Sequence, residues 1–249
     1  MTDPVVLVPL DGSKNALGVL AIATRLAELV KARVQKLHDA AESGPPAEAI
    51  LAAAADAGVR LIVMCAQTAN AEPTSEIGAA LLAVIRGAAC PVVLVDPTRA
   101  PADWALRRVL AAHDGSPSVS DALRPAAELA RAAGAEFVLL HMADGARALE
   151  TGSIAPPMYL DQVQHGWPAW SAEFLQRLGC ICPLADTRTR LVVRQGELAD
   201  ETIRVAREEA ADLIVLTWSG NWETPQTSSL TAMLQGAPCP IMVARVTAP

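Results

Sequence analysis

Two short turns carry side chains that could bind a small ligand. The tripeptide Asp-Gly-Ser occurs at 11–13 and again at 114–116, each time directly after a short apolar run. An Asp at the end of a buried parallel strand, next to the N-terminus of a helix, lies where α/β sheets hold a ligand. The same tripeptide also suits a plain strand-to-helix corner, because Asp, Gly and Ser favour turns and helix caps. Both interpretations stay open from these residues alone.

A second group of polar side chains lies near the end of the chain. Gly220 is followed by the hydroxyls of residues 227–229 and of Thr231, at the start of a predicted helix. Glycines let backbone N–H groups approach a phosphate, and hydroxyls add donors. Trp218 and Trp222 lie in the same stretch, where they could stack on a base or fill the space that a base would occupy.

The sequence contains no dedicated catalytic arrangement. It has no Gly-x-Ser-x-Gly elbow and no full Walker loop. The five cysteines are sparse, which favours buried thiols, and Cys180 and Cys182 lack the second pair of ligands that a zinc site needs. His38 and His141 end equivalent predicted strands, where a structural role is favoured. We therefore expect no dedicated enzyme activity.

The segments that position these residues repeat along the chain. Two pairs of segments are similar: LIVMCAQ at 61–67 corresponds to LIVLTWS at 213–219, and GAACPVVLV at 87–95 corresponds to GAPCPIMVA at 236–244. The spacing between the copies rises from 103 residues at the Asp-Gly-Ser turns to 152 at the LIV segments. The first copy therefore lacks about 49 residues that the second retains.

Strand and helix patterns alternate within each copy, which predicts parallel sheets with crossover helices. In the first copy we expect strands at 4–9, 33–38, 60–65 and 91–95, with helices at 14–31, 46–57 and 75–86. In the second copy we expect strands at 107–113, 136–142, 189–195, 212–218 and 239–245, with helices at 122–134, 156–179, 196–210 and 228–236. The prediction is an α/β chain of two domains, 1–98 and 106–249, joined by a Pro-containing linker.

The strand that precedes the gap is expected to lie at a sheet edge. Its sequence RVQKLHD at 33–39 is polar, whereas the counterpart EFVLLHM at 136–142 is apolar. Charged side chains on an edge strand discourage pairing with other chains. Loss of the neighbouring strand would require such a change.

Bulk composition excludes several classes of protein. The formal net charge of −7 and the pI near 5.1 argue against a nucleic-acid surface. No apolar run approaches the roughly 20 residues that cross a bilayer, and the first residues carry an acid instead of the basic start of a signal peptide. We expect a soluble, cytoplasmic protein with no membrane partner. The aromatic group of Trp167 and Trp170 is interpreted as packing or as an interface.

The repeated segments resemble the universal stress protein family. The resemblance is carried by the strand endings VPLDGS and AAHDGS, by LHD and LHM, by GPPAEAI, by LIVM and by APCPIMV. It implies two doubly wound parallel sheets of the adenine nucleotide α-hydrolase-like type, each with strand order 3-2-1-4-5, the first lacking strand 3 and one helix. It also implies pairing along the last strands, here between 91–95 and 240–245 of one chain. The chain would then form an internal pseudo-dimer, with a homodimer or a protein partner as further options.

The resemblance also implies where an adenine nucleotide such as ATP would bind. Family members that bind ATP carry a loop Gly-x2-Gly-x9-Gly-Ser/Thr after the fourth strand, and neither copy keeps it: each retains one glycine of three. The second copy is the better candidate, with these residues at the matching positions: Asp114, Met142, Thr217, Gly220, Thr227, Ser228 and Ser229. Three hypotheses follow: a signalling or binding module without ATP, an adenine-nucleotide binder that uses the second copy, and a weak nucleotide (ATP) hydrolase.

Overall fold

The computed structural model describes most of the chain. The described residues are 3–10, 14–38, 46–55, 58–66, 78–101, 103–113, 119, 122–142, 184, 187–218 and 226–246. The predicted helix at 156–179, with Trp167 and Trp170, lies outside these residues, as do Asp11, Asp114, Gly220 and Trp222.

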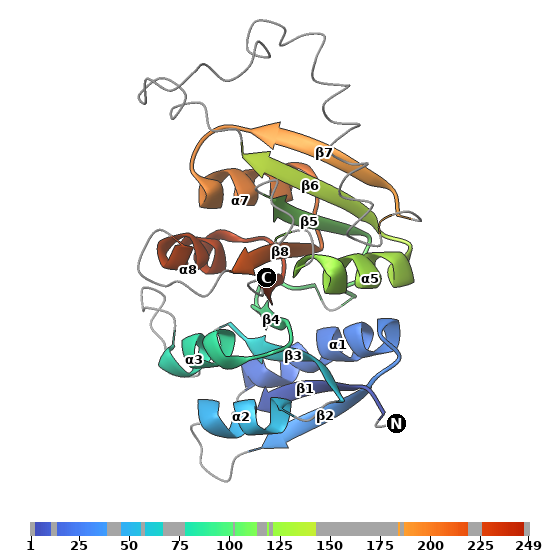
Figure 1. Cartoon of the computed structure of the whole chain (residues 1–249), viewed down its shortest axis with the longest axis vertical. Helices are drawn as coiled ribbons and strands as arrows, with labels where there is room; N and C mark the ends of the chain where they lie inside the picture. Colours follow the sequence, from blue (N-terminus) through green and yellow to red (C-terminus); the bar gives the residue numbers. More distant parts are fainter. Residues whose placement is uncertain are drawn as a thin grey trace, which may run out of the picture.

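The strands of the described residues form a single nine-stranded sheet (Figure 1). They are β1 (Val5–Leu10), β2 (Arg33–His38), β3 (Val59–Cys65), β4 (Val92–Val95), β5 (Arg108–His113), β6 (Glu136–Met142), β7 (Thr189–Arg194), β8 (Leu213–Trp218) and β9 (Ile241–Arg245). Their order across the sheet is β2-β1-β3-β4-β9-β8-β5-β6-β7. Every neighbouring pair is parallel except β4 and β9.

The antiparallel β4–β9 pair divides the sheet into two runs of parallel strands. Numbered within its own copy, the second run reads 3-2-1-4-5, and the described residues of the first run read 2-1-4-5, with no strand 3 among them. Val92 lies opposite Val243, and Leu94 lies opposite Ile241. Hydrogen bonds thus join the two runs into one sheet through the segments expected to pair. The division into domains 1–98 and 106–249 stays a prediction.

Helices cover both faces of this sheet, because its central strands are apolar on both sides. One face carries α1 (Lys14–Leu29) and α5 (Arg124–Ala133). The other face carries α2 (Ala47–Ala54), α3 (Ala79–Gly87), α7 (Leu198–Glu208) and α8 (Gln226–Gly236). Figure 1 shows α1 beside α5 and α3 beside α8 across the junction of the two runs. None of the helices within the described residues has the length and apolar character that a membrane crossing requires.

Strand β2 lies at one end of the sheet, and its side chains account for that position. Val34 and Lys36 occupy the places that Phe137 and Leu139 occupy in β6. Phe137 and Leu139 are fully buried, whereas Lys36 is exposed and Val34 only half-buried. The end strand therefore carries a charge where its inner counterpart carries an apolar side chain, which discourages further strand pairing.

The linker between the two runs is packed against the second run. Trp104 is 5% exposed, and its indole Nε1 donates a hydrogen bond to the carbonyl oxygen of Asp212 at 3.0 Å. The Asp212 carboxylate accepts hydrogen bonds from the backbone N–H groups of Arg107 and Arg108 at 2.8 and 2.9 Å. Arg99 donates to the carbonyl of Ala237, just beyond the end of α8, at 3.3 Å. The sequence suggested a plain connector, and it missed these contacts because they join residues about a hundred positions apart.

Candidate functional site

The candidate site lies at the carboxyl ends of β5, β6 and β8. Strands β5 and β8 are neighbours in the sheet although α5, β6, β7 and α7 separate them in the chain. Such a reversal of strand order opens a crevice at the carboxyl ends of the strands. His113, Met142 and Trp218 end these three strands. Asp114 follows His113 directly in the sequence but lies outside the described residues.

The structure brings together some of the predicted nucleotide-site residues. Thr217 in β8 and Ser229 in α8 line the same cavity. Met142 packs partly buried against the core on the face of α7 and α8, but it does not line that cavity. Thr227 and Ser228 lie within α8, where only their backbone is described.

The shared cavity is small and mainly apolar. Its volume is about 90 Å³. It is lined by Ile85, Leu198, Leu216, Thr217, Trp218, Ser229, Leu230, Met233 and Val243. Sites for drug-sized ligands measure roughly 300–1,000 Å³. The described walls therefore leave room for only a small fragment of a nucleotide.

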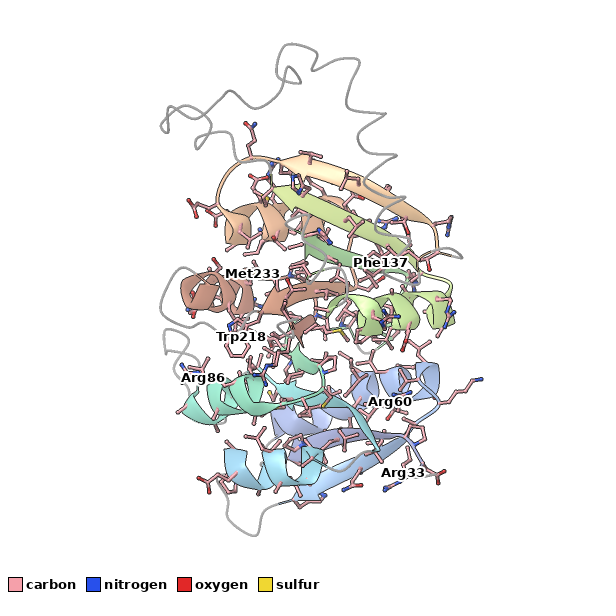
Figure 2. The ribbon with its side chains drawn as sticks, in the orientation of Figure 1. Arg33, Arg60, Arg86, Phe137, Trp218 and Met233 are labelled. Carbon is pink, nitrogen blue, oxygen red and sulfur yellow. The ribbon has the colours of Figure 1, made fainter. Side chains whose placement is uncertain are left out.

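Trp218 occupies the side of β8 that faces this cavity. Its side chain is 7% exposed and belongs to the core beneath α7 and α8, together with Leu216 and Met233. Figure 2 shows Trp218 at the seam between α8 and α3, where Ile85 of α3 also lines the cavity. Thr217 borders the cavity, but alternation along β8 directs its side chain to the opposite face from Trp218. This burial agrees with the interpretation that Trp218 fills the space that a base would occupy, and not with stacking on a base.

The histidines at the ends of β5 and β6 lie side by side. His113 and His141 are paired in the parallel register, and His113 is 4% exposed. The ring nitrogen Nδ1 of His141 is 3.1 Å from the carbonyl oxygen of His113. When Nδ1 carries the proton it donates to that carbonyl, which orients the ring through the backbone. This contact gives His141 a structural role.

The described cysteines are thiols of intermediate exposure, less buried than the sequence led us to expect. Cys65, Cys90 and Cys239 form no disulfide. Burial raises the pKa of the Cys90 thiol to about 11. Burial and the nearby charge of Asp212 raise the pKa of the Cys239 thiol to about 12. Both thiols are neutral at physiological pH and are therefore poor nucleophiles. No cluster of potential metal ligands occurs among the described residues, and Cys180 and Cys182 lie outside them.

Comparison with known proteins decides the family. A model of the universal stress protein family matches residues 105–245. The chain belongs to this family. A universal stress protein from Archaeoglobus fulgidus DSM 4304 is 15% identical, and the match covers 99% of this chain and 100% of that chain with a TM-score of 0.66. This likeness extends the fold of the family to the first half of the chain.

Two further solved structures are similar to the chain described here. A protein of unknown function from Pseudomonas aeruginosa PAO1 is 15% identical over 98% of this chain and 83% of that chain, with a TM-score of 0.58. A universal stress protein in complex with cAMP is 18% identical over 57% of this chain and 99% of that chain, with a TM-score of 0.41. No curated protein is significantly similar to the chain.

A cluster of charged residues at the start of β5, β6 and β7 was not found from the sequence. The Glu136 carboxylate accepts hydrogen bonds from Nε of Arg190 at 2.8 Å and from Nε of Arg108 at 2.9 Å. Arg190 also pairs with Glu209. The hydrogen bond from Arg190 is the largest cause that lowers the pKa of Glu136, and Arg108 adds to it. The only sequence signal is a charge near the start of each strand. The cluster joins three neighbouring strands, and these hydrogen bonds and ion pairs involve none of the described residues of the candidate site.

Proposed function

We propose that this universal stress protein is a binding or signalling module that works without ATP and without dedicated catalysis. The observation that carries the proposal is the burial of Trp218, at the end of the strand from which the family's nucleotide loop starts. The large indole ring lies in the core and lines the same cavity as Thr217 and Ser229. An aromatic side chain in that position keeps an empty crevice dry.

The loss of loop glycines supports the same proposal. A phosphate can approach backbone N–H groups closely only where no Cβ intervenes, so a loop with one glycine of three is a poor cradle. We further propose that the two copies act as an internal pair, because β4 and β9 supply within one chain the contact that the family forms between copies. A protein partner, or a second copy of the chain, would then bind elsewhere on the molecule. We keep the cytoplasm as the proposed location.

Binding of adenine nucleotide by the second copy is the second candidate function. It is favoured by one observation, that Thr217 and Ser229 border one cavity near the start of α8. In this candidate Asp114 holds the base or ribose, while Gly220, Thr227 and Ser228 hold the phosphates. Any ATP hydrolysis would be slow, since the described residues present no base beside a nucleophile at this edge.

Thermal unfolding with and without ATP separates the two functions. A ligand at 100 times its dissociation constant stabilises the folded protein by about 2.7 kcal/mol. We expect no increase in Tm with millimolar ATP, AMP or cAMP, with or without magnesium, and no nucleotide in mass spectra of the denatured purified protein. A clear increase in Tm, or a co-purified nucleotide, would establish the second candidate and overturn the first. A variant that combines Thr217→Gly with Trp218→Gly tests whether the altered loop is what prevents ATP from binding.

A further inference from the structure

A larger cleft lies on the other face of the sheet, between the two copies. Its volume is about 790 Å³, within the range of roughly 300–1,000 Å³ that is typical of small-molecule sites. The end of α1, the segments where β3 and β4 begin, and α5 form its walls. It is lined by Glu28, Leu29, Val30, Lys31, Val59, Arg60, Leu61, Ala89, Cys90, Pro91, Pro125, Glu128, Leu129, Arg131 and Ala132. It shares no lining residue with the cavity beside Trp218.

The charges around this cleft favour an anion. Three exposed cations line it: Lys31, Arg60 and Arg131. Within the described part of the chain none of them forms an ion pair. Of the two carboxylates in the lining, Glu28 already pairs with Arg25 at 3.2 Å. A local excess of positive charge on a chain of net charge −7 attracts a negatively charged ligand.

In the second copy, a tryptophan side chain covers the position equivalent to this cleft. Asp212 is the counterpart of Arg60, because both directly precede the repeated LIV segment. At Asp212 the indole ring of Trp104 is buried, and its N–H group bonds to the Asp212 carbonyl at 3.0 Å. At Arg60 the described residues instead border the open cleft, and Figure 2 shows Arg60 on the same side of the molecule as α1. One copy thus holds an aromatic ring where the other presents a cleft.

The cleft offers an apolar wall as well as cations. Leu61 and Leu129 are buried beneath it, while Leu29 and Val59 are partly buried at its surface. Cys90 contributes a neutral thiol, since burial raises the pKa of that group to about 11. A flat ring could lie against this wall, and a carboxylate on the ring would reach guanidinium groups that bind carboxylates strongly.

We propose that this cleft binds a small aromatic carboxylate. The ring lies at the start of β3, as the ring of Trp104 lies at the start of β8, and the carboxylate pairs with Arg60 and Arg131. Because α1 and β3 come from one copy and α5 from the other, the ligand bridges the two copies. The proposal is independent of whether ATP binds at the carboxyl ends of β5 and β8.

Calorimetric titration of the full chain with indole-3-acetate tests the proposal. Indole is the matched probe, because it has the ring but no carboxylate. We expect indole-3-acetate to bind and indole to bind at least about tenfold more weakly, since charge-assisted hydrogen bonds are the stronger ones. Equal affinity of the two probes, or no binding of either, would overturn the proposal.

Variants locate the bound probe. Arg60→Asp introduces the residue that the second copy has at this position. It should weaken binding of indole-3-acetate at least about tenfold, because the new side-chain carboxylate repels the ligand carboxylate that Arg60 would pair with. Arg204→Gln is the matched control, because Arg204 is an exposed cation on α7 whose partners are Glu201 and Glu208. Ala89→Trp should block the cleft without changing its charge. Equal effects of Arg60→Asp and Arg204→Gln would refute the site. Arg131→Gln takes the place of Arg60→Asp if that variant fails to fold.

Discussion

The indole N–H group of Trp104 donates a hydrogen bond to the backbone carbonyl of Asp212, 108 residues further along the chain, at 3.0 Å. Asp212 in turn accepts hydrogen bonds from the backbone of Arg107 and Arg108 through its carboxylate. The linker between the two copies is therefore part of the second copy's packing. The same contact helps to interpret the cleft beside Arg60. In the first copy, no aromatic side chain among the described residues covers the equivalent position.

Truncation of Trp104 should destabilise the fold. Trp104→Ala removes a 5%-exposed aromatic side chain and leaves a cavity, which costs about 3–5 kcal/mol of unfolding free energy. Trp104→Phe keeps most of the ring but loses the hydrogen bond, and the bond itself contributes about 1 kcal/mol. Chemical denaturation measures both variants. A loss below about 1 kcal/mol for Trp104→Ala would mean that the linker does not pack as described.

The stabilising effect of Glu136 should depend on pH. Hydrogen bonds from Arg190 and Arg108 lower the pKa of Glu136 from its usual 4.5. A carboxylate whose pKa is lower in the folded state contributes stability above the unfolded-state pKa and loses it as the pH falls through the folded-state pKa. The difference in unfolding free energy between the wild type and Glu136→Gln should therefore be largest at neutral pH and shrink below pH 4.5. Urea unfolding at pH 7 and at pH 3.5 checks this, with Glu128→Gln as the control. A difference that is independent of pH would contradict it.

An apolar side chain on the end strand should promote self-association. Lys36→Leu places in β2 the residue type that β6 carries at Leu139. Because β2 ends the sheet, loss of the charge leaves an edge that can pair with another chain. Light scattering should show mass that rises with protein concentration for Lys36→Leu, whereas the polar control Lys36→Gln should match the wild type. Identical masses for all three proteins would show that Lys36 has no protective role.

Two cysteines should resist alkylation in the folded protein. With pKa values of about 11 for Cys90 and about 12 for Cys239, few molecules carry a thiolate at pH 8. Iodoacetamide should modify both positions far more slowly in the native protein than in urea, where their pKa values return to about 8.5. Peptide mass spectrometry measures the two rates separately. Equal rates in both states would show that the fold does not shield these thiols.

The sequence alone determined the repeat, the alternation of strands and helices, and the family. These depend on local patterns: apolar runs of strand length, helical spacing, and turns such as the one at Gly134, which ends α5 with a left-handed φ of 64°. The polar segment 33–38 also predicted the end of the sheet, because an exposed strand needs charges that a buried strand cannot carry.

Only the tertiary structure decided how Trp104 and Trp218 are used. Trp104 lies in a linker without a diagnostic pattern, and the repeated segment that contains Trp218 left two roles open for its ring. The burial of both side chains depends on elements distant in the chain: Asp212 for Trp104, and α3 of the other copy beside Trp218. The cleft at Arg60 is likewise formed where α1 and α5 meet across the β4–β9 junction. Packing between distant segments is a property of the assembled sheet, so no short stretch of residues encodes it.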